Sequence, residues 1–90
     1  FDLTLGDPVS ITIKFSPEAA RRVRGRRWCR KQEITELEDK SLILQMETSG
    51  KQDILRWVLS FAEEAEILDP PELIDDFLHL LTSTFEQYKK

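Results

Sequence analysis

Alternating apolar and polar residues predict the strands of this chain. Residues 9–15 have the sequence VSITIKF, in which the odd positions are β-branched or aromatic and would face a core. The same period of two predicts a second strand at about residues 28–37 and a third at 41–48, joined by a turn at 38–40. A short fourth strand is expected at 65–68, because an aspartate and two prolines follow it directly.

Helical spacing predicts three further elements. Ser16-Pro17-Glu18 combines a capping hydroxyl, a proline suited to the first turn and a carboxylate near the helix dipole, so a short helix begins there. Gly25 can end that helix in the left-handed conformation. Apolar residues three and four apart predict a second helix after Gly50 and a last helix over about residues 72–88.

The order β-α-β-β-α-β, followed by one more helix, indicates an α+β fold of the ferredoxin-like type. Such a fold has an antiparallel sheet with both inner helices on one face. Its other face, with side chains such as Ile43, would be solvated unless it is covered. We expect the last helix, or a second copy of the chain, to cover it. Residues 1–8 are interpreted as a linker, and residues 9–90 as one domain.

Composition limits the class of protein. Ninety residues with 40% hydrophobic and 33% charged content fit one small globular domain and not a disordered segment. No apolar run reaches the roughly 20 residues that a bilayer-spanning helix needs. A single cysteine cannot form an internal disulfide, so we expect a cytoplasmic protein. Because the chain begins with Phe1 instead of Met, we expect it to be part of a longer protein.

Positive charge is concentrated in residues 21–31. This segment holds seven of the thirteen basic residues and no acidic one, although the net charge of the chain is −4. A cationic segment around an aromatic ring is typical of surfaces that bind single-stranded nucleic acid, through phosphate contacts and base stacking. The candidate nucleic-acid or anion-binding residues are Arg22, Arg24, Arg26, Arg27, Trp28, Arg30 and Lys31. Alternatively, these arginines form a solvated helix face paired with acids elsewhere, and the tryptophan packs at a strand end.

The last helix carries more apolar surface than one stripe, which is more than a small sheet needs. A homodimer is therefore expected. The candidate interface residues are Trp57, Phe77, Leu78, Leu81 and Phe85. Tryptophan is enriched at interface hot spots, but Trp57 could equally be half-buried between helix and sheet.

Several segments, taken in order, carry a family resemblance. They are residues 11–24, 27–28, 36–39, 49–50, 55–61 and 65–73. Together they resemble the C-terminal WCX domain of bacterial WYL-domain transcriptional regulators. The chain departs from the family at Cys29-Arg30-Lys31-Gln32, where the family often has His-Pro-Ser-Gln, and at Lys40, where a glycine is usual in the hairpin turn.

The resemblance implies a domain order: a winged-helix DNA-binding domain, then a WYL effector-sensing domain joined through residues 1–8, then this module. It also implies a role in dimer formation and in the response to an effector, which can be single-stranded nucleic acid. The WYL motif is absent from the chain, so no ligand residues are carried over from it.

Other functions are disfavoured by the residues present. No nucleophile–base set, metal-binding cluster or phosphate-binding glycine loop occurs, so we expect neither an enzyme nor a bound metal or cofactor. An RNA-recognition motif needs aromatic residues on its central strands, where this chain has aliphatic ones. The alternative function is a ferredoxin-like dimer that senses an anionic metabolite at its subunit interface.

Overall fold

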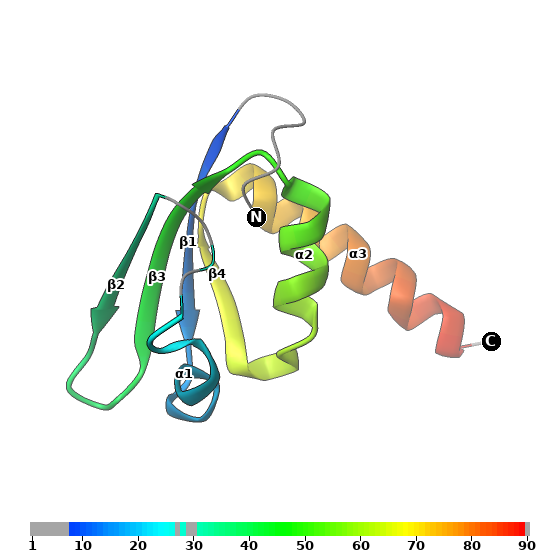
Figure 1. Cartoon of the computed structure of the whole chain (residues 1–90). Helices are drawn as coiled ribbons and strands as arrows, with labels where there is room; N and C mark the ends of the chain where they lie inside the picture. Colours follow the sequence, from blue (N-terminus) through cyan, green and yellow to red (C-terminus); the bar gives the residue numbers. More distant parts are fainter. Residues whose placement is uncertain (1–7, 27, 29–30, 90) are drawn as a thin grey trace.

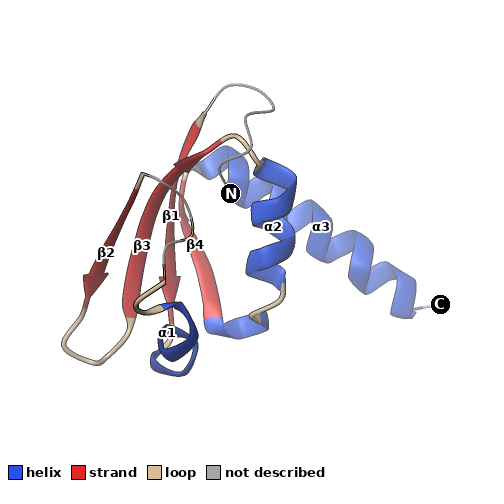
Figure 2. Ribbon diagram, viewed as in Figure 1, coloured by secondary structure: helices blue, strands red, loops and turns tan. Residues whose placement is uncertain are grey.

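The computed structural model describes residues 8–26, 28 and 31–89. The elements are β1 (Val9–Phe15), α1 (Pro17–Val23), β2 (Gln32–Glu36), β3 (Leu42–Thr48), α2 (Lys51–Leu59), the 3-10 turn η1 (Ala62–Glu64), β4 (Ala65–Asp69) and α3 (Pro71–Lys89). The four strands form one sheet in the order β2-β3-β1-β4, and every pair is antiparallel (Figure 2). This order confirms the predicted α+β, ferredoxin-like arrangement with an added C-terminal helix.

The sheet buries one face under α1 and α2 (Figure 1). Ile11, Ile13 and Phe15 of β1 are buried, as the alternation predicted. Their partners across β3 include Met46 and Leu44, which are buried on the same face. Register is fixed because a shift by one residue would move all of these apolar side chains into water.

The long helix α3 follows β4 directly, passes behind α2 in the view of Figure 1, and packs its first half against the core. Leu73 is buried in the core cluster, and Lys51 Nζ of α2 lies 2.7 Å from Asp76 Oδ2. The expectation that this helix covers the second face of the sheet is therefore wrong: Gln45 and Leu68 on that face are exposed. Leu73 inserts into the core directly after β4, which commits the start of α3 to the buried side. No helix in the described part of the chain combines the length and apolar character that crossing a membrane requires.

The hairpin between β2 and β3 contains a residue in an unfavourable backbone conformation. Lys40 has φ 75°, in the left-handed region that favours glycine. Next to it, the backbone N–H of Ser41 donates to Asp39 Oδ1 at 3.0 Å, and the Ser41 hydroxyl donates to the same oxygen. These hydrogen bonds lower the pKa of the Asp39 carboxyl, the side-chain bond from Ser41 contributing most.

The second strand begins later than predicted, at Gln32 instead of about residue 28. Trp28 lies outside the sheet, where its backbone N–H donates to Gln32 Oε1. The Gln32 side chain in turn donates to the carbonyl of Arg26 at 2.9 Å. The Gln32 side chain thus links Trp28 and Arg26 to the start of β2, so this side-chain bridge, and not strand pairing, positions Trp28.

Candidate functional site

The arginine edge, defined as residues 21–31, begins on α1. Ser16 caps this helix by accepting a hydrogen bond from Ala19 N at 3.2 Å. Burial of Ala19, Ala20 and Val23 fixes the rotation of the helix. The positions between them therefore face water, and the arginines at 21, 22 and 24 are exposed. Gly25, with φ 80°, ends the helix as predicted.

Two cations of the arginine edge pair with carboxylates of the sheet. Arg24 Nε donates to Glu36 Oε1 at 3.0 Å, and Lys31 Nζ lies 3.8 Å from Glu47 Oε1. Both pairs are exposed to solvent, where such contacts contribute about 0–1 kcal/mol and leave the cations accessible. The interpretation that some of these residues pair with acids is correct for Arg24 and Lys31.

Other arginines of the edge contact rings instead of carboxylates. The Arg22 guanidinium carbon lies 4.6 Å from the centroid of the Phe61 ring, and that of Arg26 lies 5.8 Å from the Trp28 ring. Among the described residues, no carboxylate is within ion-pair distance of Arg21, Arg22 or Arg26. Three exposed guanidinium groups thus keep their donors available for an anion.

The aromatic residue of the arginine edge takes part in core packing. The Trp28 ring is half-buried, and its indole N–H donates to the carbonyl of Val23 at 3.3 Å. Its ring lies against Trp57 of α2, and both tryptophans border the core cluster. The alternative interpretation, in which this tryptophan packs, is therefore correct in part: contact with Trp57 covers part of the Trp28 ring surface on which a base would stack. Arg27, Cys29 and Arg30 lie outside the described residues.

The predicted interface residues fall into two groups. Trp57 and Phe77 pack against the core, and Trp57 makes edge contacts with Phe15 and Phe61 at 5.6 and 5.3 Å between ring centroids. Leu78, Leu81 and Phe85 lie farther along α3 than Phe77 and are exposed, by 52%, 37% and 62%.

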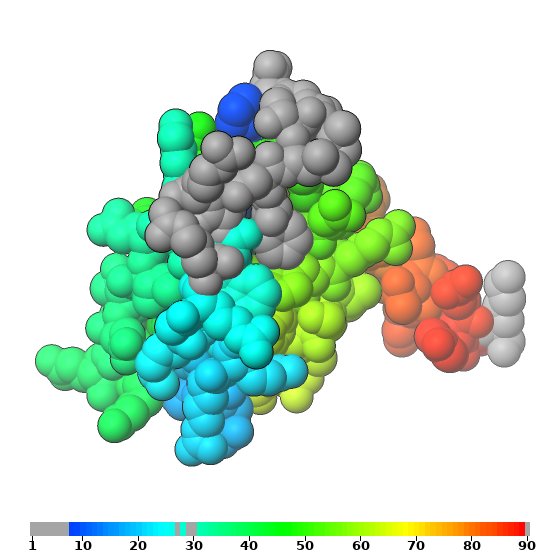
Figure 3. All heavy atoms as spheres, viewed as in Figure 1, coloured from blue at the N-terminus to red at the C-terminus, as the bar shows by residue number. Residues whose placement is uncertain are grey.

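Tyr88, which was not among the predicted interface residues, is 86% exposed. Its place three residues after Phe85 was the signal that could have added it to them. We call Leu78, Leu81, Phe85 and Tyr88 the outer stripe of α3. In the space-filling view the end of α3 stands clear of the rest of the molecule (Figure 3). Apolar side chains that are adjacent on a helix and exposed are a candidate docking surface.

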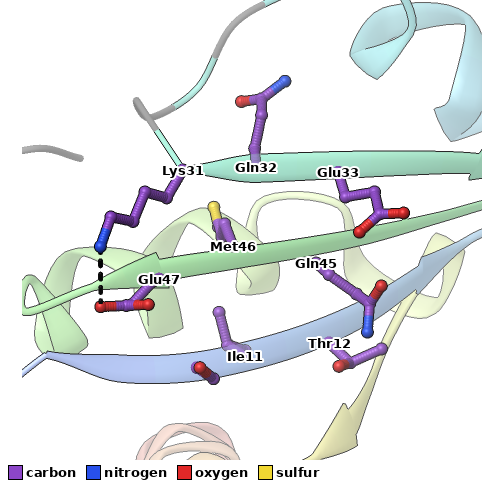
Figure 4. A pocket seen from close by; sticks show the side chains of 9 residues that line it. Ile11, Thr12, Lys31, Gln32, Glu33, Gln45, Met46 and Glu47 are labelled. Carbon is purple, nitrogen blue, oxygen red and sulfur yellow. Dashed lines mark ion pairs between the residues drawn. The ribbon is translucent and has the colours of Figure 1, made fainter.

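A shallow hollow of about 380 Å³ lies on the uncovered face of the sheet (Figure 4). Thr12, Glu33 and Gln45 project into it from three neighbouring strands, and the Lys31–Glu47 ion pair lies at one end. The lining mixes both signs of charge, so it favours no particular ion. Within the described ranges, no group of three or more potential metal ligands is present.

A comparison with protein families identifies the chain. The model of the WCX domain matches residues 7–84, from the residues just before β1 into the second half of α3. The chain belongs to the WCX domain family. A comparison with curated proteins finds no match to it. Within this WCX domain, the arginine edge lies wholly inside the matched range, whereas Phe85 and Tyr88 of the outer stripe lie beyond its end.

Proposed function

We propose that this WCX domain is the C-terminal regulatory and dimerisation module of a DNA-binding transcriptional regulator. The observation that carries the proposal is the outer stripe of α3. Large apolar side chains that face water at adjacent helix positions cost hydration free energy, which contact with a second subunit would recover. An interface that brings two modules together is what a regulator bound to a two-fold symmetric operator requires.

Sedimentation equilibrium of the 90-residue chain tests the dimerisation role directly. We expect a dimer at high micromolar concentration. Leu78→Gln with Phe85→Gln should raise the dissociation constant at least tenfold, because a loss of about 1.4 kcal/mol of apolar contact has that effect. His79→Gln with Ser83→Gln, two exposed positions on the polar side of α3, is the matched control and should leave the constant unchanged. A monomer at every concentration would contradict the proposal.

We further propose that the arginine edge takes part in effector sensing by binding single-stranded nucleic acid. The support is that Arg21, Arg22 and Arg26 are exposed and that no described carboxylate lies within ion-pair distance of them. Each phosphate contact to a single strand contributes about 0.7 to the slope of log affinity against log salt. A single anionic metabolite, the alternative effector, would give a shallow slope.

Fluorescence titration with a labelled oligonucleotide at several salt concentrations tests this part of the proposal. Arg21→Gln with Arg26→Gln should weaken binding and flatten the slope by about 1.4, the contribution of two phosphate contacts. Lys40→Gln with Arg56→Gln removes the same charge from exposed positions outside the arginine edge and is the control. Equal losses in the two double variants would show that only net charge matters, and the arginine edge would then have no specific role.

A further inference from the structure

The outer stripe has the spacing of a two-helix seam. Leu78, Leu81, Phe85 and Tyr88 follow one another at intervals of three, four and three residues. This is the alternation of a and d positions along which two helices pack. A neighbouring stripe on the same broad apolar side, in which Leu73 is buried and Phe77 and Leu80 are partly buried, faces the core. The core therefore covers the beginning of this apolar side, and the outer stripe, from Leu78 onward, stays exposed.

Negative charge is concentrated at the beginning of α3. Glu72, Asp75 and Asp76 lie there, whereas the last two turns carry one acid and one base, Glu86 and Lys89. Asp76 is paired with Lys51 of α2, whereas Asp75 is exposed. In a parallel pair of α3 helices, like charges would lie opposite each other at both ends. In an antiparallel pair, the acidic beginning of each helix would instead lie near Lys89 of the other, and the two helix dipoles would point in opposite directions, which is favourable.

Side-chain size supports the same direction. A two-fold axis close to residue 83 brings Leu78 opposite Tyr88 of a second copy and Leu81 opposite Phe85. Each leucine then packs against an aromatic ring, and each Asp75 lies close to a Lys89. In a parallel pair, the two leucines would instead meet at one end and the aromatic residues would crowd together at the other.

We propose that α3 pairs antiparallel with α3 of a second copy of this chain, in a two-fold symmetric contact centred near residue 83. The proposal rests on the dimerisation function above and specifies how the dimer forms. Half of the contact comes from Phe85, Tyr88 and Lys89, which lie beyond the range matched by the family model.

Disulfide trapping tests the direction of the pair. In a Cys29→Ser background, Leu78→Cys and Tyr88→Cys proteins are oxidised mildly, each alone and as an equimolar mixture. Antiparallel pairing brings residue 78 opposite residue 88, whereas two copies of residue 78 lie about ten residues, or about 15 Å, apart along the axis. A disulfide needs Cα atoms within about 4.4–6.8 Å. The mixture should therefore give at least five times the cross-linked product of either protein alone, identified by its mass.

A charge exchange provides an independent readout. Asp75→Lys should weaken the dimer by several-fold, and adding Lys89→Glu in the same chain should restore it, because each end again meets an opposite charge. Cross-linking of Leu78→Cys with itself and no rescue would mean a parallel pair, which overturns this inference and leaves dimerisation intact. A dimer that gives no α3 cross-link would also overturn it, and a monomer in sedimentation would overturn the proposed function together with it.

Discussion

The ring centroids of Trp28 and Trp57 lie 4.7 Å apart, with an angle of 46° between the ring planes. This contact joins the loop that follows α1 to the last turn of α2, across a separation in sequence that no local rule predicts. Trp57 in turn packs edge-on against Phe61, whose ring lies under the Arg22 guanidinium. The arginine edge is therefore supported by an aromatic cluster that continues into the core.

Replacing Trp28 should lower the stability of the domain even when no ligand is present. Trp28→Ala removes a half-buried ring and should lower the free energy of unfolding by about 2 kcal/mol, less than full burial would give. Trp28→Phe keeps an aromatic contact with Trp57 and should lose less than half of that. Urea unfolding followed by far-ultraviolet circular dichroism measures both. An unchanged midpoint in Trp28→Ala would mean that the ring does not pack against Trp57 in solution.

The cap of α1 should contribute measurably to stability. The Ser16 hydroxyl accepts from Ala19 N and donates to the Glu64 carboxylate, and its backbone N–H donates to the Glu64 carbonyl at 2.8 Å. Ser16→Ala should cost about 1 kcal/mol, while Ser16→Thr keeps the hydroxyl and should cost less. Ser83→Ala, at an exposed position on α3, should stay within about 0.5 kcal/mol of the unsubstituted protein. Equal effects of Ser16→Ala and Ser83→Ala in chemical unfolding would contradict this role.

The hairpin turn should be improved by a glycine. Lys40 is exposed and has φ 75°, a conformation that costs an L-residue about 1 kcal/mol. Lys40→Gly should therefore raise the free energy of unfolding, by up to about 0.5 kcal/mol after the greater flexibility of the unfolded chain is deducted. Glu38→Gly, two residues earlier and outside the left-handed region, is the control and should not stabilise. A lower melting temperature for Lys40→Gly would contradict the strained turn.

Acid should weaken the same hairpin through Asp39. Its pKa is lowered mainly by the hydrogen bond from the Ser41 hydroxyl, so the folded state favours the charged carboxylate. A depressed folded pKa contributes stability above the ordinary pKa of about 3.9, and this contribution is lost as the pH falls through the lower folded value. In Asp39→Asn, which does not ionise, stability should fall less steeply over this acidic range. Parallel pH profiles of the two proteins would exclude a contribution from this carboxylate.

The sheet and its buried face could be predicted because the alternation of apolar and polar residues within one strand determines which face of the sheet is buried. Once one face of β1 is apolar, only one register keeps Ile11 and Ile13 out of water. The position of Trp28 could not be predicted in the same way, because its environment depends on Trp57 of a different element. The direction in which α3 leaves the sheet could not be predicted from its own residues either. It is set by Leu73, which packs into the core beside β4.

The candidate site was predictable only in part. The charge of the arginine edge follows from composition, but its pairing with Glu36 and Glu47 depends on which strands become neighbours. The sequence predicted correctly that α3 has more apolar residues than the core can cover. Which of them face the core and which form the outer stripe depends on the rotation of the helix about its axis, and tertiary contacts set that rotation.

Amide hydrogen exchange along α3 tests the central claim, that its outer stripe is a subunit contact. The second half of α3 has few contacts within its own chain, and an isolated helix of that length is marginal in water. Protection of residues 78–89 should therefore rise at least tenfold as the protein concentration increases from about 1 µM to about 1 mM, while exchange in β1 and β3 follows global stability. Fast exchange over residues 78–89 that does not change with concentration would contradict the account.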